Sequence, residues 1–291
     1  MLWIVKTDSC PNYRALTYCI DNQLYLGEGN PNAGILIVGK ECAIGDAEFG
    51  REIGSEYGTG NDDAQRYILK EKAVAGLNLD GWNRILREGV GTEQIEAQIG
   101  QKAAYSNRYY PLFPHLGQKY QQRRKGGAIG DEGTSPTWYF YQKLADKILG
   151  HPIRSRDDLI DFHLGCFHTE MNQIPLPMSG LLPGKLDYLR AGAIEKRKAL
   201  FRQPFFRRFP VVILAVGHYP RNYSFDIEEI FDVDFRASNR NGSDWWNLHY
   251  NRSGSPRMLI HTRQFSMVSD AFVEGTADLC RRFVADHGRV E

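Results

Sequence analysis

Four short apolar stretches, rich in β-branched side chains, stand out along the chain. Stretches of this length and composition are typical of strands that are buried on both faces of a sheet. We therefore predict strands at residues 35–38, 164–168, 211–216 and 258–260, with the least regular pattern at 164–168.

Between these stretches, apolar residues recur at helical spacing. The clearest case is residues 136–149, where Ser135 can cap the first turn, a proline suits the first helical position and Gly150 ends the helix. We predict a second helix beginning near Ser155, and a last helix over residues 269–287 with its apolar side chains on one side.

The order of these elements predicts the fold class. Strands that alternate with helices indicate an α/β protein, here a three-layer α/β/α sandwich with a short, mostly parallel central sheet. Segments 16–26 and 223–236 are predicted to form hairpins or strands added at the sheet edge. Residues 41–62 and 105–136 are Gly-rich or polar with little periodicity, so we expect long loops there, which are either functional or disordered. No repeat or linker divides residues 1–291, which predicts a single domain.

Composition excludes several classes of protein. Of the 291 residues, 42% are hydrophobic and 24% are charged, which is typical of a globular protein and not of a disordered one. No apolar run approaches the roughly 20 residues that span a bilayer, and the apolar stretch in the first six residues is too short for the apolar region of a signal peptide. We therefore expect a soluble, cytoplasmic protein with no membrane partner, and the sequence predicts no protein partner.

The cysteines and glycines exclude common cofactor sites. The five cysteines include no C-x-x-C pair, which argues against a disulfide framework and against an iron–sulfur cluster. His163, Cys166 and His168 are ligand types of zinc, but no matching second pair exists in the sequence, so no metal is predicted. Neither a G-x-G-x-x-G motif nor a P-loop occurs, and we expect no cofactor.

The near-neutral net charge of +1 conceals a basic segment, residues 185–208. This segment carries eight basic residues against two acidic ones, a local charge of +6. Clustered cations can bind a phosphate backbone, and they can equally form a solvated helix face. If nucleic acid binds here, the candidate backbone contacts are Arg197, Lys198, Arg207 and Arg208.

Polar residues follow each predicted strand. The first strand is followed by Gly39, Lys40 and Glu41, and the second by residues 169–175, which include Asn172. The third is followed by residues 217–220, which include His218, and the fourth by His261 to Ser266. In an open α/β sheet, ligands bind beyond the carboxyl ends of the strands, where the loops diverge. We therefore expect these groups to gather in one active site at that edge.

These motifs resemble those of the uracil-DNA glycosylase superfamily. The Gly39-Lys40-Glu41 segment resembles the first motif of that family, with Glu41 at the position of its water-activating acid. Asn172, followed by Pro175, resembles the segment that recognises the base. The segment from His261 to Ser266 resembles the final His-containing loop. The resemblance extends over about residues 30–285 and implies a short parallel sheet between helices and a DNA partner.

The resemblance also implies a mechanism, the cleavage of an N-glycosidic bond. Glu41 would activate water and stabilise positive charge on the sugar, and His261 would donate a hydrogen bond to the departing base. Asn172 would recognise the edge of a flipped base, and Arg263 would hold a phosphate. The remaining candidates for substrate binding, stacking included, are Gly39, Phe49, Tyr57, His218 and Ser266.

Each assignment has a structural alternative. Glu41 can cap a helix, Asn172 can close a turn, and His261 can be a buried imidazole at a strand end. The Trp245-Trp246 pair fits a core or hairpin cover. At the level of function, the rivals are a non-catalytic nucleic-acid-binding protein of the same fold, using residues 185–208, and a small-molecule hydrolase.

Overall fold

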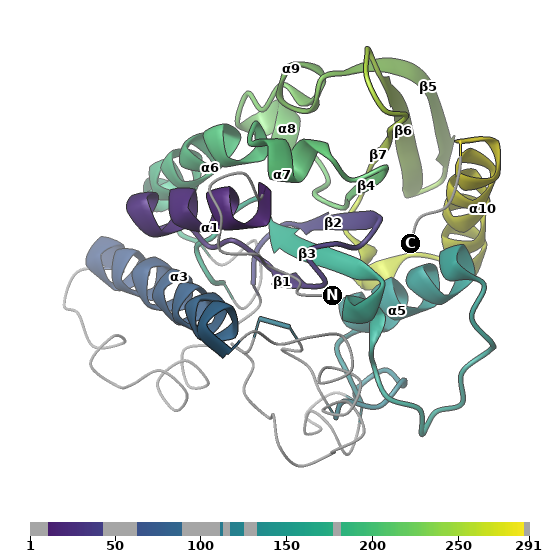
Figure 1. Ribbon diagram of the computed structural model, residues 1–291, viewed down its shortest axis with the longest axis horizontal. Coiled ribbons are helices and arrows are strands. Elements are labelled where there is room, and N and C mark those ends of the chain that lie inside the picture. Colours follow the sequence, from purple (N-terminus) through teal and green to yellow (C-terminus); the bar gives the residue numbers. More distant parts are fainter. Residues whose placement is uncertain are drawn as a thin grey trace.

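A computed structural model describes residues 11–42, 63–88, 111–112, 117–124, 133–176 and 182–287. Its strands form one sheet, in the order β1-β3-β2-β4-β7-β6-β5 (Figure 1). The strands are β1 (Glu28–Gly29), β2 (Ile35–Gly39), β3 (Cys166–Glu170), β4 (Val211–Leu214), β5 (Val233–Asn241), β6 (Asp244–Asn251) and β7 (Met258–Thr262). The four predicted strands are all present, as β2, β3, β4 and β7.

The centre of this sheet is parallel. Strand β2 pairs in parallel with β3 on one side and β4 on the other, and β4 pairs in parallel with β7. The flanking strands β1, β6 and β5 are antiparallel to their neighbours. Every residue of the four parallel strands is buried. The predicted α/β class is confirmed, but the sheet as a whole is mixed: it is parallel in its centre, and within the described residues three antiparallel pairings flank the three parallel ones.

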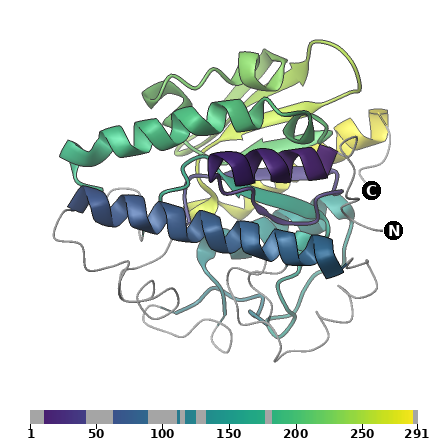
Figure 2. The same cartoon turned by 60° about the vertical axis from the view of Figure 1, so that its left-hand side comes forward.

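Helices cover both faces of the sheet (Figures 1 and 2). Side chains of β2 alternate between the faces, so Leu36 and Val38 pack in one apolar core while Ile35 and Ile37 pack in the other. The first core lies under α1, α3, α6 and α7, and the second under α5 and α10. The bounds of these helices are α1 (Pro11–Asn22), α3 (Asp63–Glu88), α5 (Pro136–Leu149), α6 (Asp187–Phe201), α7 (Pro204–Arg207) and α10 (Asp270–His287).

The helices with clear capping residues were predicted correctly. Ser135 accepts a hydrogen bond from the Trp138 amide at the start of α5, and Gly150 ends the helix with φ of 72°. Helix α10 begins one residue after the predicted start and ends at the predicted residue, 287. Both helices pack on the same sheet face, and Lys147 of α5 forms an ion pair with Glu274 of α10.

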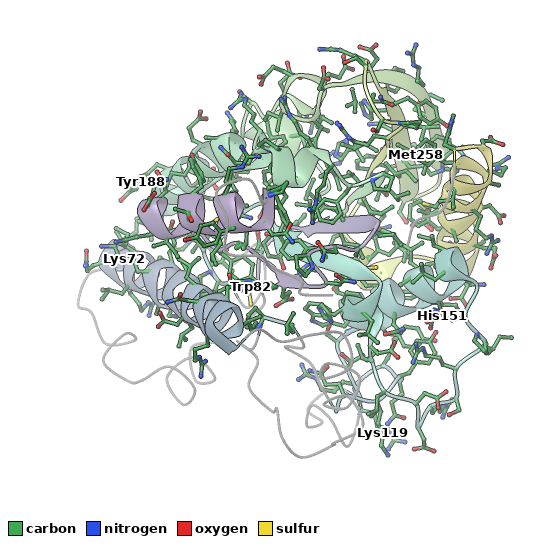
Figure 3. The ribbon with its side chains drawn as sticks, in the orientation of Figure 1. Lys72, Trp82, Lys119, His151, Tyr188 and Met258 are labelled. Atoms are coloured by element: carbon green, nitrogen blue, oxygen red, sulfur yellow. The ribbon has the colours of Figure 1, made fainter. Side chains whose placement is uncertain are left out.

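Two predictions of local structure were wrong, and one long helix was not predicted. Segment 16–26 is not a hairpin: α1 extends to Asn22, because its buried residues Asn12, Ala15, Leu16 and Cys19 have helical spacing. The helix predicted near Ser155 is absent, and this stretch instead forms turns and one bridge between Leu159 and Lys119. Helix α3 was not predicted, although it supplies the fully buried Trp82, whose indole donates to the Gly27 carbonyl at 2.8 Å (Figure 3).

Segment 223–236 proved more complex than an edge hairpin. It contains α9 (Ile227–Phe231) and the first residues of β5. The actual hairpin joins β5 to β6 through Gly242 and Ser243, and Gly242 has φ of 60°, a conformation that glycine adopts without strain. In the described parts of the chain, no helix combines the length and the apolar character needed to cross a lipid bilayer.

Candidate functional site

The carboxyl ends of the parallel strands meet at one edge of the sheet, as predicted. The segments that follow β2 and β3 remain hydrogen-bonded beyond the strands, because the amides of Met171 and Asn172 donate to the carbonyls of Gly39 and Lys40, each at 2.8 Å. The segment after β4 is held in the same way, since the Gly217 amide donates to the Thr262 carbonyl at 2.9 Å. These backbone contacts fix the positions of the side chains that follow.

Glu41, Asn172 and Tyr219 form a hydrogen-bonded cluster at this edge. The Tyr219 hydroxyl donates to Glu41 Oε2 at 2.6 Å, and the Asn172 amide nitrogen approaches the same oxygen at 3.4 Å. All three residues are buried, with Glu41 the most exposed at 9%. The sequence distances are 131 residues from Glu41 to Asn172 and 178 from Glu41 to Tyr219. The structure therefore brings together two of the predicted site residues.

Asn172 also closes a turn, which was the structural alternative to a role in substrate binding. Its Oδ1 accepts from the Ile174 amide at 3.1 Å, which closes a turn, and its Nδ2 also lies 3.5 Å from the Ile174 carbonyl. The residue has no exposed surface. Both ends of the amide are therefore engaged within the protein, and its contact with Glu41 is the one directed at the candidate site.

Two cationic side chains lie next to this cluster. Lys40 Nζ lies 5.0 Å from the centre of the Tyr219 ring, and the Arg190 guanidinium lies 5.5 Å from the same centre. Arg190 is held there by Asp187 and by the Tyr223 hydroxyl, both at 3.1 Å. Burial lowers the pKa of Lys40, Glu41 raises it, and Arg190 and Arg263 lower it further. Two cations, Lys40 and Arg190, therefore lie against the Tyr219 ring whose hydroxyl binds Glu41.

His261 is a neutral, buried imidazole. Burial lowers its pKa to about 4, although the Gly217 carbonyl raises it. Its Nε2 lies 2.7 Å from the Gly217 carbonyl, so this nitrogen carries the proton, while Nδ1 can accept from Asn247 at 3.5 Å. The ring N–H that was predicted to serve a departing base is thus bound to the protein. Gly217 and Tyr219, two residues apart, link His261 to the Glu41 cluster.

The other predicted substrate contacts are dispersed. His218 is exposed and stacks on Trp245, with ring centres 5.4 Å apart and an interplanar angle of 8°. Arg263 is paired with Asp244 at 3.2 Å, and Ser266 lies half-buried in a short 3-10 helix, Phe265–Met267. Phe49 and Tyr57 lie outside the described residues. Gly39 lies so close to Glu170 that a Cβ at position 39 would overlap Glu170 Oε2.

The predicted backbone-binding cations do not form a free surface. Arg197 is fully buried and donates to the Tyr25 carbonyl at 2.5 Å and to Thr169 Oγ1 at 2.7 Å, so no phosphate can reach it in this position. Lys198 pairs with Glu195 at 2.5 Å. Arg207 donates to the carbonyls of residues 229 and 230, and Arg208 donates to the carbonyl of residue 31.

Acidic side chains from distant segments neutralise the rest of residues 185–208. Lys185 lies 4.0 Å from Asp63, and Lys196 lies 3.7 Å from Glu71, both on α3. Arg202 pairs with Glu229 of α9 at 2.5 Å. The basic segment is therefore largely engaged in contacts within the protein.

Sequence reasoning missed a buried polar group beside the candidate site. Glu170, the last residue of β3, is 7% exposed, and its Oε2 has no hydrogen-bond partner within the part of the chain that is described. Burial raises the pKa of its carboxyl to about 8, with His168 acting in the opposite direction. Its position at a predicted strand end was the available signal, but burial of a glutamate cannot be inferred from one sequence.

The two zinc-type histidines, His163 and His168, belong to the same buried group. Glu28 Oε1 lies 3.0 Å from His168 Nδ1 and 3.6 Å from His163 Nε2, while His168 Nε2 lies 3.6 Å from Glu170 Oε1. Burial acts to raise the pKa of Glu28, but the hydrogen-bonded His168 and the nearby His163 hold this pKa well below its usual range. Among the described residues, no group of histidine, cysteine, aspartate and glutamate side chains could hold a metal ion.

Comparisons with protein-family models, with curated proteins and with solved structures found no match to this chain. Its likeness to the uracil-DNA glycosylase superfamily therefore stays a prediction from the sequence motifs.

Proposed function

We propose that the protein is a hydrolase that cleaves the N-glycosidic bond of a base in DNA or in a related nucleobase compound. The observation that supports this proposal best is the contact of Glu41 with Asn172 and Tyr219 at the carboxyl edge of the parallel strands. A carboxylate fixed at this edge can activate water and can stabilise the positive charge that develops on the sugar.

Tyr219 and Asn172 act on the reaction through Glu41. The two donors bind Oε2 and so orient the carboxylate, which is the preorganisation that electrostatic catalysis requires. Asn172 is a positioning residue in this proposal and not the group that recognises the base, because its amide is already engaged by Ile174.

The departing base acquires negative charge, which needs a donor or a cation nearby. His261 is poorly suited to this role, since its N–H is bound to the Gly217 carbonyl. Lys40 is better placed: it follows β2 directly and lies over the Tyr219 ring that contacts Glu41. We assign to Lys40 the stabilisation of the anionic base.

Base release tests the proposal. The protein is incubated with single-stranded and duplex oligonucleotides that carry one uracil, hypoxanthine or alkylated base, and with the corresponding nucleosides, and free base is measured by chromatography. Glu41→Gln should lower the rate by at least about 100-fold, and Tyr219→Phe by roughly tenfold, because it removes one hydrogen bond to a charged group.

The matched control is Glu274→Gln, an exposed change on α10 that should leave the rate unaltered. The proposal fails if folded protein releases no base from any compound in this panel, or if Glu41→Gln retains the rate of the unchanged protein.

No observation favours a nucleic-acid-binding function for residues 185–208. A backbone-binding surface needs cations that are free to replace counterions on phosphates. Arg197 is instead buried, and acidic side chains of α3, α6 and α9 lie within ion-pair distance of Lys185, Lys196, Lys198 and Arg202.

A further inference from the structure

A column of aromatic rings leads from the interior to the surface next to the candidate site. The edge of the buried His261 ring meets Trp245, with ring centres 5.0 Å apart and an interplanar angle of 84°. His218 stacks on Trp245, nearly parallel to it, and is exposed to solvent. The column therefore ends in an exposed imidazole, on which a further flat ring can stack.

Exposed cations stand beside this column. Arg240 is the residue of β5 directly opposite Trp245 of β6, and opposite residues of an antiparallel pair lie on the same face of a sheet. Helix α8 (Tyr219–Asn222) begins directly after His218, and Arg221 is its third residue. Both arginines are exposed, and neither has a carboxylate within ion-pair distance among the described residues.

The charges of these arginines also act on the His218 imidazole. Burial lowers the pKa of His218, and the positive charges of Arg221, Lys40 and Arg240 lower it further. Asp244, the residue before Trp245, is bound by Arg263 and by Ser269. The surface formed by Lys40, His218, Arg221, Arg240 and Trp245 is termed here the hairpin-end surface. It combines a stacking ring with positive charge, and its two arginines have no carboxylate within ion-pair distance among the described residues.

We propose that the hairpin-end surface binds single-stranded DNA, with one base stacked on His218 and the phosphates of the strand paired with Arg221 and Arg240. This inference rests on the proposed function, which it extends by naming the part of the protein that holds the strand. Stacked aromatic rings beside free cations are the features by which proteins bind unpaired strands. Because Tyr219, the neighbour of His218, contacts Glu41, a strand held here passes next to the candidate catalytic carboxylate.

Binding of a labelled thymidine 12-mer, followed by fluorescence anisotropy at several salt concentrations, tests the inference. All proteins carry Glu41→Gln, so that no turnover occurs. The double variant Arg221→Gln with Arg240→Gln should weaken binding by about tenfold or more. It should also reduce the slope of log K against log salt concentration by about 1.4, the value expected for two phosphate contacts on a single strand. His218→Ala should weaken binding by roughly tenfold through loss of stacking.

The matched control is Lys198→Gln with Arg282→Gln, which removes two cations elsewhere and should leave affinity and salt dependence nearly unchanged. Equal effects of the two double variants would overturn the inference. So would binding of thymidine monophosphate as tight as that of the 12-mer, because it would show a nucleotide site and not a strand-binding surface.

The base-release assay separates this inference from the proposed function. If the unchanged protein releases base but 12-mer binding does not depend on Arg221 and Arg240, the strand-binding role of the hairpin-end surface is wrong and the proposed reaction still holds. If 12-mer binding depends on these arginines but no base is released, the strand-binding role holds and the proposed hydrolysis is wrong.

Discussion

Arg197 is a cation whose role is set entirely by its surroundings. It lies on α6 with no exposed surface, above the Phe201 ring at 5.2 Å, and donates to Tyr25 and Thr169. Burial lowers its pKa to about 10, so it remains charged at neutral pH. Its hydrogen bonds tie α6 to β3 and to the chain before β1.

The substitution Arg197→Ala should therefore lower the free energy of unfolding by about 3 kcal/mol or more, because it leaves a cavity and unpaired acceptors in the core. The control is Lys185 of the same basic segment, whose side chain is 74% exposed. Lys185→Ala removes a pair with Asp63 at 4.0 Å, which is worth less than about 1 kcal/mol. Urea unfolding measures both. Similar losses for the two variants would contradict the structural role of Arg197.

Glu170 makes stability depend on pH. In the unfolded chain its carboxyl titrates near pH 4.5, and in the folded protein near pH 8. Between these values the folded state binds more protons than the unfolded state, so the free energy of unfolding falls as the pH rises.

Replacing Glu170 by glutamine removes this titration. Glu170→Gln should reduce the loss of stability between pH 5 and pH 8, and should be more stable than the unchanged protein at pH 8. Urea unfolding at a series of pH values measures the effect, and Glu274→Gln, on the surface of α10, should not alter the slope in this interval. An unchanged slope in Glu170→Gln would show that Glu170 is already ionised in the folded protein.

A glycine at the end of β2 leaves room for a buried carboxyl group at the end of β3. Gly39 and Glu170 are register partners at the ends of these strands. Because Gly39 has no Cβ, the Glu170 carboxyl lies over its backbone. Gly39 was predicted to contact substrate, and the structure shows a separate reason for a glycine at this position.

Gly39→Ala should lower the free energy of unfolding by about 1–3 kcal/mol, as expected for an overpacked buried site. The loss should be smaller in a Glu170→Ala background, where the overlapping carboxyl is absent, and a double-mutant cycle measures the difference. Gly275 in α10 is the matched control, since nothing lies within 4 Å of a Cβ added there. Gly275→Ala should stabilise the helix by about 0.5–1 kcal/mol.

Buried cysteines lie in both cores of the molecule, so their reactivity measures whether the two helical layers remain packed on the sheet. Cys19 lies in the core beneath α1, and Cys166 and Cys280 lie in the core beneath α5 and α10. Burial raises the pKa of all three thiols, to about 12 for Cys19 and Cys280. These thiols should therefore be unreactive as long as both layers remain packed.

A variant with Cys10→Ala and Cys42→Ala retains only these three thiols. It should react with a thiol reagent at the rate of global unfolding, and the three groups should react together. Spectrophotometric thiol titration with increasing urea measures this rate. Fast reaction of Cys19 alone, without urea, would show that α1 opens independently of the sheet.

The sequence by itself determined the elements whose signals are local. The apolar stretches became β2, β3, β4 and β7, and the capped pattern after Ser135 became α5, because strand burial and helix capping depend on neighbouring residues. The edge at which polar groups gather also followed from the sequence, since parallel strands end on the same side.

Only the tertiary structure decided which side chains meet and which are buried. The contact between Glu41 and Asn172 spans 131 residues, Arg197 of an apparently basic surface lies in the core, and Glu71 of an unpredicted helix pairs with Lys196. These outcomes depend on packing between distant segments, and packing determines solvent exposure and therefore charge, hydrogen bonding and pKa. A pattern along the chain carries the period of an element but not the neighbours that the element acquires.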